Sequence, residues 1–268
     1  MRFWTMLFVV LVFQSDVIAA TSVDIYQDME SGNDGDLLTP TLMNASSHGA
    51  GSTWSLTGGM WVSNDNARNL PGPVVVAGTT YAGTGATRTW KFNDNNANNF
   101  VRVSLRSSYP RITVACFYTP MVTIRFWNQF DTIIMSGNLG FSVLQTTKED
   151  VKGPYIRAHS CSAGWKTTFS PDHIAVKSGK TYWVNLHFDG TAGKTSVAVF
   201  DPDAAFAQVG TTVVAESVPN STMKGGVNFG RGDNHGNNST AKSQSCFGQI
   251  LVDYSNGAFP LIPGVAEK

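Results

Sequence analysis

Short runs of β-branched and aromatic residues, separated by turn-forming residues, recur along the chain from residue 21 onward. No long segment repeats its apolar residues at helical spacing, whereas many of these runs alternate apolar and polar residues with a period of two. The stretches between them, such as residues 177–180 and 189–194, favour tight reversals. The pattern predicts an all-β protein, folded as a sandwich or barrel of antiparallel strands.

The strand pattern continues without interruption to the carboxyl end. The candidate strands cover residues 101–105, 112–118, 122–127, 132–135, 141–145, 155–160, 182–188, 196–200, 211–215 and 248–254. No repeat, linker or change of composition separates residues 24 and 263, so we expect one domain at residues 21–263. Residues 264–268 would form a loose C-terminal tail.

The first twenty residues have the pattern of a secretory signal peptide. Arg2 precedes an apolar run at residues 3–13, and the small residues Ala19 and Ala20 suit signal peptidase. The apolar run is too short to span a bilayer as a helix. We therefore expect residues 1–20 to be removed and the mature protein to be secreted to the extracellular space or the periplasm. Retention of this segment as a membrane anchor is the alternative.

Basic and acidic residues are equal in number. The chain has 19 basic and 19 acidic residues, and removal of Arg2 and Asp16 with the signal peptide leaves 18 of each. A net charge of zero gives no electrostatic reason to expect binding to nucleic acid or to an anionic membrane surface.

Three cysteines in an oxidising compartment allow one disulfide bond. Alternation places Cys116 on the same strand face as Ile112 and Val114, where a thiol packs as a small apolar group. Cys161 and Cys246 lie at strand margins among Ser and Gly, and we expect a disulfide between them. Three reduced cysteines are the alternative. No paired Cys or His spacing of the zinc type occurs in the sequence.

Two passages carry more information than the general strand pattern. YWVNLHFDG at residues 182–190 turns through a Gly-bearing hairpin into SVAVFDP at residues 196–202, and FGQILVDY stands at residues 247–254. The first passage resembles the paired central strands of concanavalin A-like jelly rolls, including laminin-G-like domains. The second is similar to the closing strand of such domains, which pairs with a strand near the amino end, here residues 24–30.

The resemblance implies a two-sheet antiparallel jelly-roll sandwich. It also implies a concave face that often holds glycans and, in some members, a calcium ion. The sequence does not locate such an ion, and we expect no other cofactor. The asparagine-rich stretch at residues 94–98 lacks the Gly and Glu of an EF-hand loop.

Alternation within two strands predicts a ligand-binding surface. Their core-facing sets are Tyr182, Val184, Leu186 and Phe188 in one strand and Ile156, Ala158 and Ser160 in the other. The opposite faces then carry Trp183, Asn185 and His187 in the first strand and Tyr155, Arg157 and His159 in the second. If both strands lie in the concave sheet, these polar and aromatic groups share one surface.

Such a surface suits a carbohydrate or polysaccharide. An indole covers the C–H face of a pyranose, while guanidinium, amide and imidazole groups hydrogen-bond its hydroxyls or carboxylate. The predicted ligand-binding residues are Trp183, Asn185, His187, Arg157 and His159. An ordinary solvated sheet face is the alternative.

The same group supports an enzymatic alternative, a polysaccharide lyase acting on a polyuronate. Its candidate catalytic residues are Tyr155, Arg157, His159 and His187, which could neutralise the carboxylate and move a proton. The Arg-x-Glu-x-Arg and Gln-Ile-His strands of alginate-lyase jelly rolls are absent. A retaining glycosidase needs two neighbouring carboxylates, but Glu30 is the only glutamate with an acidic residue two positions away, Asp28. This class of enzyme is therefore disfavoured. A structural or adhesive surface protein is the third class, and Arg231-Gly232-Asp233, which matches the integrin tripeptide, also suits a simple loop reversal.

Overall fold

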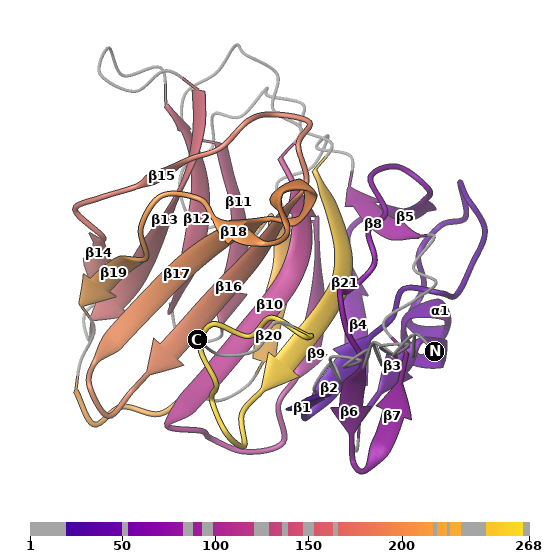
Figure 1. The fold of residues 1–268 in the computed structure, drawn as a ribbon, viewed down its shortest axis with the longest axis horizontal. Helices are drawn as coiled ribbons and strands as arrows, with labels where there is room; N and C mark the ends of the chain where they lie inside the picture. Colours follow the sequence, from indigo (N-terminus) through magenta and orange to yellow (C-terminus); the bar gives the residue numbers. More distant parts are fainter. Residues whose placement is uncertain are drawn as a thin grey trace, which may run out of the picture.

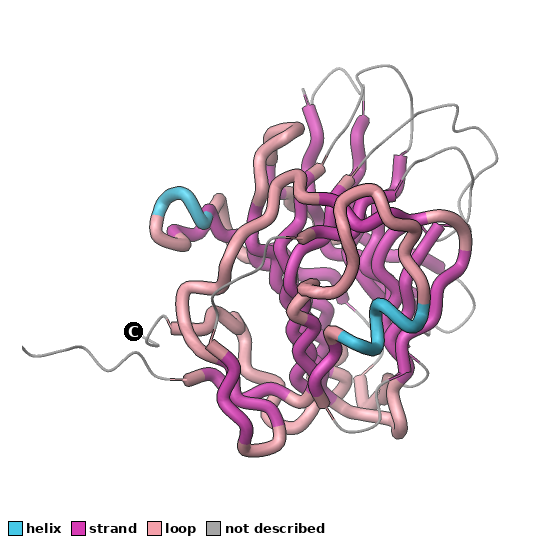
Figure 2. Tube along the Cα trace, turned by 90° about the vertical axis from the view of Figure 1, so that its right-hand side faces the viewer, coloured by secondary structure: helices cyan, strands magenta, loops and turns pink. Residues whose placement is uncertain are grey.

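The described chain is almost entirely β-structure, as the sequence predicts (Figure 2). The computed structural model describes residues 20–49, 53–82, 88–92, 99–120, 129–135, 139–146, 153–162, 166–216, 219–223, 226–231 and 245–264. The predicted signal peptide, apart from Ala20, and the predicted strand at residues 122–127 lie outside these ranges. No helix among the described residues is both long and apolar enough to cross a membrane.

Two antiparallel sheets form the layers of a sandwich (Figure 1). The first has ten strands, with the central order β18-β17-β16-β10-β21-β2-β3, and β19, β8 and β5 attached at its sides. Its strands are β2 (Ile25–Gln27), β3 (Ser47–His48), β5 (Met60–Ser63), β8 (Thr89–Phe92), β10 (Arg111–Thr119), β16 (Tyr182–Asp189), β17 (Lys194–Asp201), β18 (Ala207–Gln208), β19 (Val213–Glu216) and β21 (Cys246–Asp253). In Figure 1 this layer faces the reader.

The second layer is an eight-stranded sheet with the order β14-β13-β12-β11-β20-β9-β4, and β15 pairs with β13. Its strands are β4 (Thr53–Thr57), β9 (Asn99–Ser104), β11 (Gln129–Met135), β12 (Leu139–Thr146), β13 (Gly153–Ser162), β14 (Lys166–Phe169), β15 (Ile174–Ala175) and β20 (Gly226–Arg231). Figure 1 shows β11, β12 and β13 behind the ten-stranded sheet. The predicted all-β sandwich of two antiparallel sheets is therefore confirmed.

The strand pairings expected from the two motifs are present. β16 and β17 form an antiparallel hairpin that closes at the pair Asp189 and Lys194. The closing strand β21 pairs with β2, near the amino end, and with β10 on its other side. β21 thus occupies a central position in the ten-stranded sheet, although it is formed by some of the last described residues.

The main hydrophobic core lies between the sheets and has the predicted parity. Its residues include Ile112, Val114 and Cys116 of β10, Tyr182, Val184, Leu186 and Phe188 of β16, Ile156 and Ala158 of β13, Val101 and Val103 of β9, and Val227 and Phe229 of β20. Burial of these apolar side chains is the main favourable contribution to folding.

A second hydrophobic cluster covers the outer face of the ten-stranded sheet. It joins side chains of this sheet to residues of the small sheet and of two further segments: Tyr26, Ala115, Phe117, Trp183, Ala198, Phe200 and Leu251 meet Val23, Leu70, Val74, Val76 and Leu261. All eight residues of β21 are consequently buried. Strands covered on both faces lose the apolar and polar alternation that marks a half-exposed strand.

A small three-stranded sheet supplies part of this cover. It consists of β1 (Thr21–Val23), β6 (Val74–Val76) and β7 (Thr79–Tyr81), and β1 pairs with β6 in parallel. The helix α1 (Pro40–Ala45) begins where Thr39 caps it, because the Thr39 Oγ1 accepts a hydrogen bond from the Leu42 N–H. A single 3-10 turn, η1 (Pro202–Ala204), follows β17.

Candidate functional site

The predicted site residues of β16 are bound to the chain's own C-terminal segment. Trp183 is fully buried, and its indole N–H donates to the carbonyl oxygen of Leu261 at 2.8 Å. Its ring packs edge to face against Phe117, with centroids 4.8 Å apart. In Figure 1 the yellow C-terminal segment crosses in front of the ten-stranded sheet.

Asn185 and His187 hold the same segment. The Asn185 Oδ1 accepts a hydrogen bond from the backbone N–H of Leu261 at 2.7 Å. Side chains of β16 therefore bind both the N–H and the carbonyl oxygen of Leu261. The His187 ring stacks on Phe259, with centroids 5.1 Å apart, and its Nδ1 lies 2.9 Å from the Thr113 Oγ1. Burial lowers the pKa of His187. The prediction that Trp183, Asn185 and His187 face an open ligand surface is wrong for this conformation.

The predicted site residues of β13 lie in the other layer. Tyr155, Arg157 and His159 belong to the eight-stranded sheet, whereas β16 belongs to the ten-stranded sheet. The prediction that the two strands share one face is therefore wrong, and the four-residue lyase set is not assembled, because His187 lies in the opposite sheet. The parity assigned to β13 is correct, since Ile156 and Ala158 enter the core and the alternate residues face outward.

Arg157 is half-buried on this outer face and has aromatic neighbours. Its guanidinium carbon lies 3.8 Å from the ring centroid of Phe169 and 5.8 Å from that of Tyr155. Burial lowers the pKa of Arg157, although the nearby Tyr155 opposes this shift. The buried Nε of Arg157 has no hydrogen-bond partner in the described part of the chain. Tyr155 and His159 are more deeply buried. The rings of His159 and Phe169 pack edge to face, with their centroids 6.0 Å apart.

The strand registers extend this face to two residues that the sequence did not indicate. Arg102 of β9 stands opposite Asn228 of β20 on one side and opposite Ser55 of β4 on the other. Their strand neighbours Val101, Val103, Val227 and Phe229 enter the core, which places Arg102 and Asn228 on the outer face. Both are half-buried, and the Asn228 Oδ1 has no hydrogen-bond partner among the described residues. Nothing in the local sequence separates these two polar residues from others that alternate with core residues.

Glycine makes room for Arg102 on the sheet. A Cβ atom at Gly226 would lie 2.7 Å from the Arg102 Nε and 2.6 Å from the carbonyl oxygen of Val103. The arginine side chain therefore lies close to the backbone of β20, beside Asn228. From β13 to β9 the sheet order is β13-β12-β11-β20-β9, so Arg157 and Arg102 lie four strand spacings apart, roughly 19 Å. We call the surface formed by Arg102, Asn228, Tyr155, Arg157 and His159 the outer polar face.

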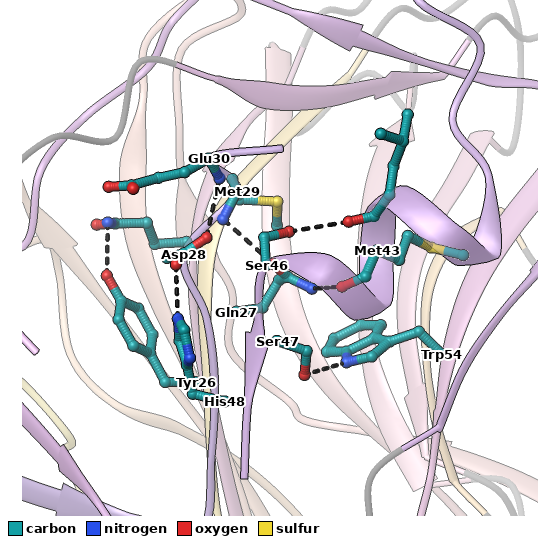
Figure 3. A network of polar contacts seen from close by, with 12 residues as sticks. Tyr26, Gln27, Asp28, Met29, Glu30, Met43, Ser46, Ser47, His48 and Trp54 are labelled. Carbon is teal, nitrogen blue, oxygen red and sulfur yellow. Dashed lines mark hydrogen bonds and ion pairs between the residues drawn. The ribbon is translucent and has the colours of Figure 1, made fainter. Parts of the chain in front are cut away.

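A second polar network joins the amino-terminal strands (Figure 3). The His48 Nε2 lies 2.6 Å from the Asp28 Oδ2, and the His48 ring stacks on Tyr81 at 4.0 Å. Nearby, the Gln27 amide donates to the Met43 carbonyl oxygen, which ties α1 to β2. Within the described residues, His48 bonds to no Ser, Thr or Cys that it could activate as a nucleophile. The arrangement holds β2, β3 and α1 together, and it also occupies Asp28 of the acidic pair considered for hydrolysis.

The disulfide prediction is contradicted. Cys246 is a buried thiol of the ten-stranded sheet, opposite Lys91 of β8, whereas Cys161 belongs to β13 in the other sheet. Burial raises the pKa of the Cys246 thiol to about 11. Cys116 packs in the main core beside Ile112 and Val114, as predicted. The side chain of Cys161 is outside the described part of the structure.

Two other predictions fall partly or wholly outside the described residues. Gly232 and Asp233 of the Arg-Gly-Asp tripeptide lie there, as does the asparagine-rich stretch at residues 94–98. Among the residues that are described, no group of three His, Cys, Asp or Glu side chains is arranged to hold a metal ion. The structure thus gives no location for the calcium ion that the resemblance implied.

Among known proteins, similarity to this chain is found only in the folds of solved structures. No family model matches the chain, and no curated protein matches it. One similar solved structure is the cellulose-induced protein Cip1, with 14% sequence identity and a TM-score of 0.44; the match covers 86% of this chain and 97% of Cip1. Another is the exoplasmic/lumenal domain of VIP36 in its Ca2+/Man-bound form, with 7% sequence identity and a TM-score of 0.41; the match covers 68% of this chain and 84% of that domain. A peanut lectin structure has 11% identity and a TM-score of 0.38 over 72% and 95%.

All three similar structures are concanavalin A-like jelly rolls, the class that the sequence motifs resemble. At these identities and TM-scores the likeness carries neither a ligand nor an activity to this chain.

Proposed function

We propose that this chain is a secreted carbohydrate-binding protein that holds its ligand on the outer polar face of the eight-stranded sheet. Secretion rests on the signal-peptide pattern of residues 1–20. The ligand site rests on the contrast between the outer faces of the two sheets. A second hydrophobic cluster covers one of them, whereas half-exposed polar side chains lie on the other.

The observation that carries the proposal is that two buried polar atoms of the outer polar face, the Arg157 Nε and the Asn228 Oδ1, have no hydrogen-bond partner in the described part of the chain. Leaving a buried polar group unsatisfied costs about 1–3 kcal/mol, so such groups are rare and call for a partner from outside the chain. One is a donor and the other an acceptor, and an amide can exchange its two ends by rotating. Sugar hydroxyls can serve each of them at two separate points of one polysaccharide, because a hydroxyl both donates and accepts hydrogen bonds.

The surrounding groups suit the same ligand. The half-exposed ring of Phe169 lies beside the guanidinium of Arg157, and aromatic rings pack against the C–H groups of a pyranose. Ser55 and Arg102 add hydrogen-bonding groups at the other end of the face. Polar groups that converge on one face, beside apolar ring surfaces, are typical of small-ligand sites.

Asn228→Ala tests the proposal. Because the Asn228 Oδ1 makes no hydrogen bond in the described structure, its removal should leave the thermal midpoint unchanged or raise it, while it lowers polysaccharide affinity by about fivefold to tenfold. Affinity electrophoresis against a panel of neutral and acidic polysaccharides measures binding, and circular dichroism measures stability. Asn256→Ala, at an exposed amide in the turn after β21, is the matched control and should bind like the wild type.

Two results would overturn the proposal. One is wild-type protein that binds none of the polysaccharides in the panel. The other is an Asn228→Ala variant that binds as tightly as the wild type and the Asn256→Ala control.

A further inference from the structure

We propose that the ligand of the outer polar face is an anionic polysaccharide, with carboxylate or sulfate groups that pair with Arg157 and Arg102. This inference rests on the proposed function and names the class of saccharide. It follows from the charges on this face, from their burial and from the distance between them.

Arg157 has lost part of its hydration without gaining a counter-ion. Its guanidinium is half-buried over Phe169, and it takes part in no ion pair within the described residues. Ring faces compensate a buried cation only in part, because a cation–π contact is weaker than a charge-assisted hydrogen bond to an anion. An incoming carboxylate or sulfate would supply the missing partner and meet the unsatisfied Nε.

Arg102, at the far end of the face, also has no counter-ion among the described residues. It forms no ion pair in the described chain, and its aliphatic stem is packed over Gly226 rather than extended into solvent. Four other basic side chains differ in this respect: Arg68, Lys91, Arg111 and Lys180 each lie within 4.0 Å of an aspartate. The two arginines of the outer polar face are thus left with their charge available.

Among the outward positions whose side chains the structure describes, no acidic residue neighbours these arginines. The outward strand positions with described side chains are Thr53, Ser55 and Thr57 of β4, Phe100, Arg102 and Ser104 of β9, Gly226, Asn228 and Gly230 of β20, Tyr155, Arg157 and His159 of β13, Phe169 of β14, and Ala175 of β15. None of these is Asp or Glu. Because the whole chain has a formal net charge of zero, the positive charge is a local property of this face and not a general one.

The distance between the two arginines favours a polymer. Four strand spacings, roughly 19 Å, separate the strands that carry them, which is longer than a single sugar ring. An acidic polysaccharide lying across the strands would place successive charged groups near Arg157 and near Arg102. Asn228 lies on a strand between those of the two arginines and would contact uncharged groups of the polysaccharide.

The test compares matched polymers that differ in charge alone. The probes are polygalacturonate and its fully methyl-esterified form, and dextran sulfate and dextran, each measured by titration calorimetry against the wild type, Arg102→Gln, Arg157→Gln and Arg68→Gln. Arg68→Gln removes the same charge from an exposed pair with Asp203, away from the outer polar face. We expect an acidic polymer to bind at least tenfold more tightly than its neutral counterpart.

Each substitution on the face should lower affinity for the acidic polymer about tenfold, and the effect should shrink as salt is added, while Arg68→Gln changes affinity less than twofold. Preference for polygalacturonate identifies a carboxylate ligand and preference for dextran sulfate identifies a sulfate ligand. Equal binding of acidic and neutral polymers would overturn this inference and leave the carbohydrate site standing, whereas no binding to any of the four removes both.

An equal loss in all three variants would also overturn the inference, because it would show attraction by overall charge. Neither face arginine makes an ion pair in the described structure, so both variants should keep the wild-type thermal midpoint. If one of them fails to fold, the other variant and the salt dependence of the wild type still decide the outcome.

Discussion

Trp183→Phe should destabilise the protein without weakening carbohydrate binding. The substitution keeps an aromatic ring beside Phe117 but removes the indole N–H that donates to the Leu261 carbonyl oxygen at 2.8 Å. This buried oxygen then lacks its partner, at a cost of about 1–3 kcal/mol. The smaller ring leaves a void of roughly 40 Å³, which adds about 1 kcal/mol at ~24 cal/mol per Å³. The expected loss is therefore about 2–4 kcal/mol.

Urea denaturation followed by circular dichroism measures this loss directly. In a chain of this size the thermal midpoint should fall by about 5–15 °C. Trp61→Phe is the matched control, because Trp61 is half-exposed on β5 and its indole N–H donates to no other described residue. Its substitution should cost under about 1 kcal/mol. A Trp183→Phe variant with wild-type stability and reduced polysaccharide binding would refute the assignment of Trp183 to the C-terminal contact.

Three other predictions concern the same layers. Asn185→Ala should cost about 1–3 kcal/mol, because it leaves the Leu261 N–H without its acceptor, and a double-mutant cycle with Trp183→Phe should show coupling, since both side chains hold Leu261. Burial holds the pKa of His187 below its ordinary value, so at mildly acidic pH the unfolded chain binds a proton that the folded chain does not. The protein should therefore have its full stability above a pH of about 6.5 and lose stability as the pH falls toward the folded pKa. Thermal melts at pH 7 and pH 5 should show a smaller loss of stability for His187→Gln than for the wild type. Gly190→Ala should lower the thermal midpoint, at a cost of about 1–3 kcal/mol or more, because its Cβ would overlap the Ser221 carbonyl oxygen and the Phe188 ring; an unchanged melting curve would contradict this.

The sequence predicted local structure better than long-range placement. The strand pattern located β10, β16, β17 and β21. Alternation also assigned core-facing residues of β10, β13 and β16 correctly, because the direction of each side chain follows from the order of residues within the strand. The motif at residues 247–254 also predicted the pairing of β21 with β2. The strands between residues 53 and 92 were missed, since each has only three to five residues, too few to establish a period of two.

The candidate site could be predicted only in part, for a physical reason. Alternation shows that Trp183 points away from the main core, but it cannot show that Leu261, 78 residues further along the chain, lies over it. Arg157 was found because its strand neighbours Ile156 and Ala158 are apolar. Arg102 and Asn228 join it through strand order, which short motifs do not encode, and the sheet assignment of β13 and β16 was wrong for the same reason.

The central position of β21 has a consequence for how this chain acquires its structure during synthesis. Until residues 246–253 leave the ribosome, β10 and β2 have no strand between them, and the ten-stranded sheet consists of separate pieces. Contacts between residues so distant in the chain form slowly, because the entropy of closing the long intervening segment is lost first. A nascent chain that stops short of residue 245 should therefore remain sensitive to protease, whereas one that includes residue 262 should become resistant.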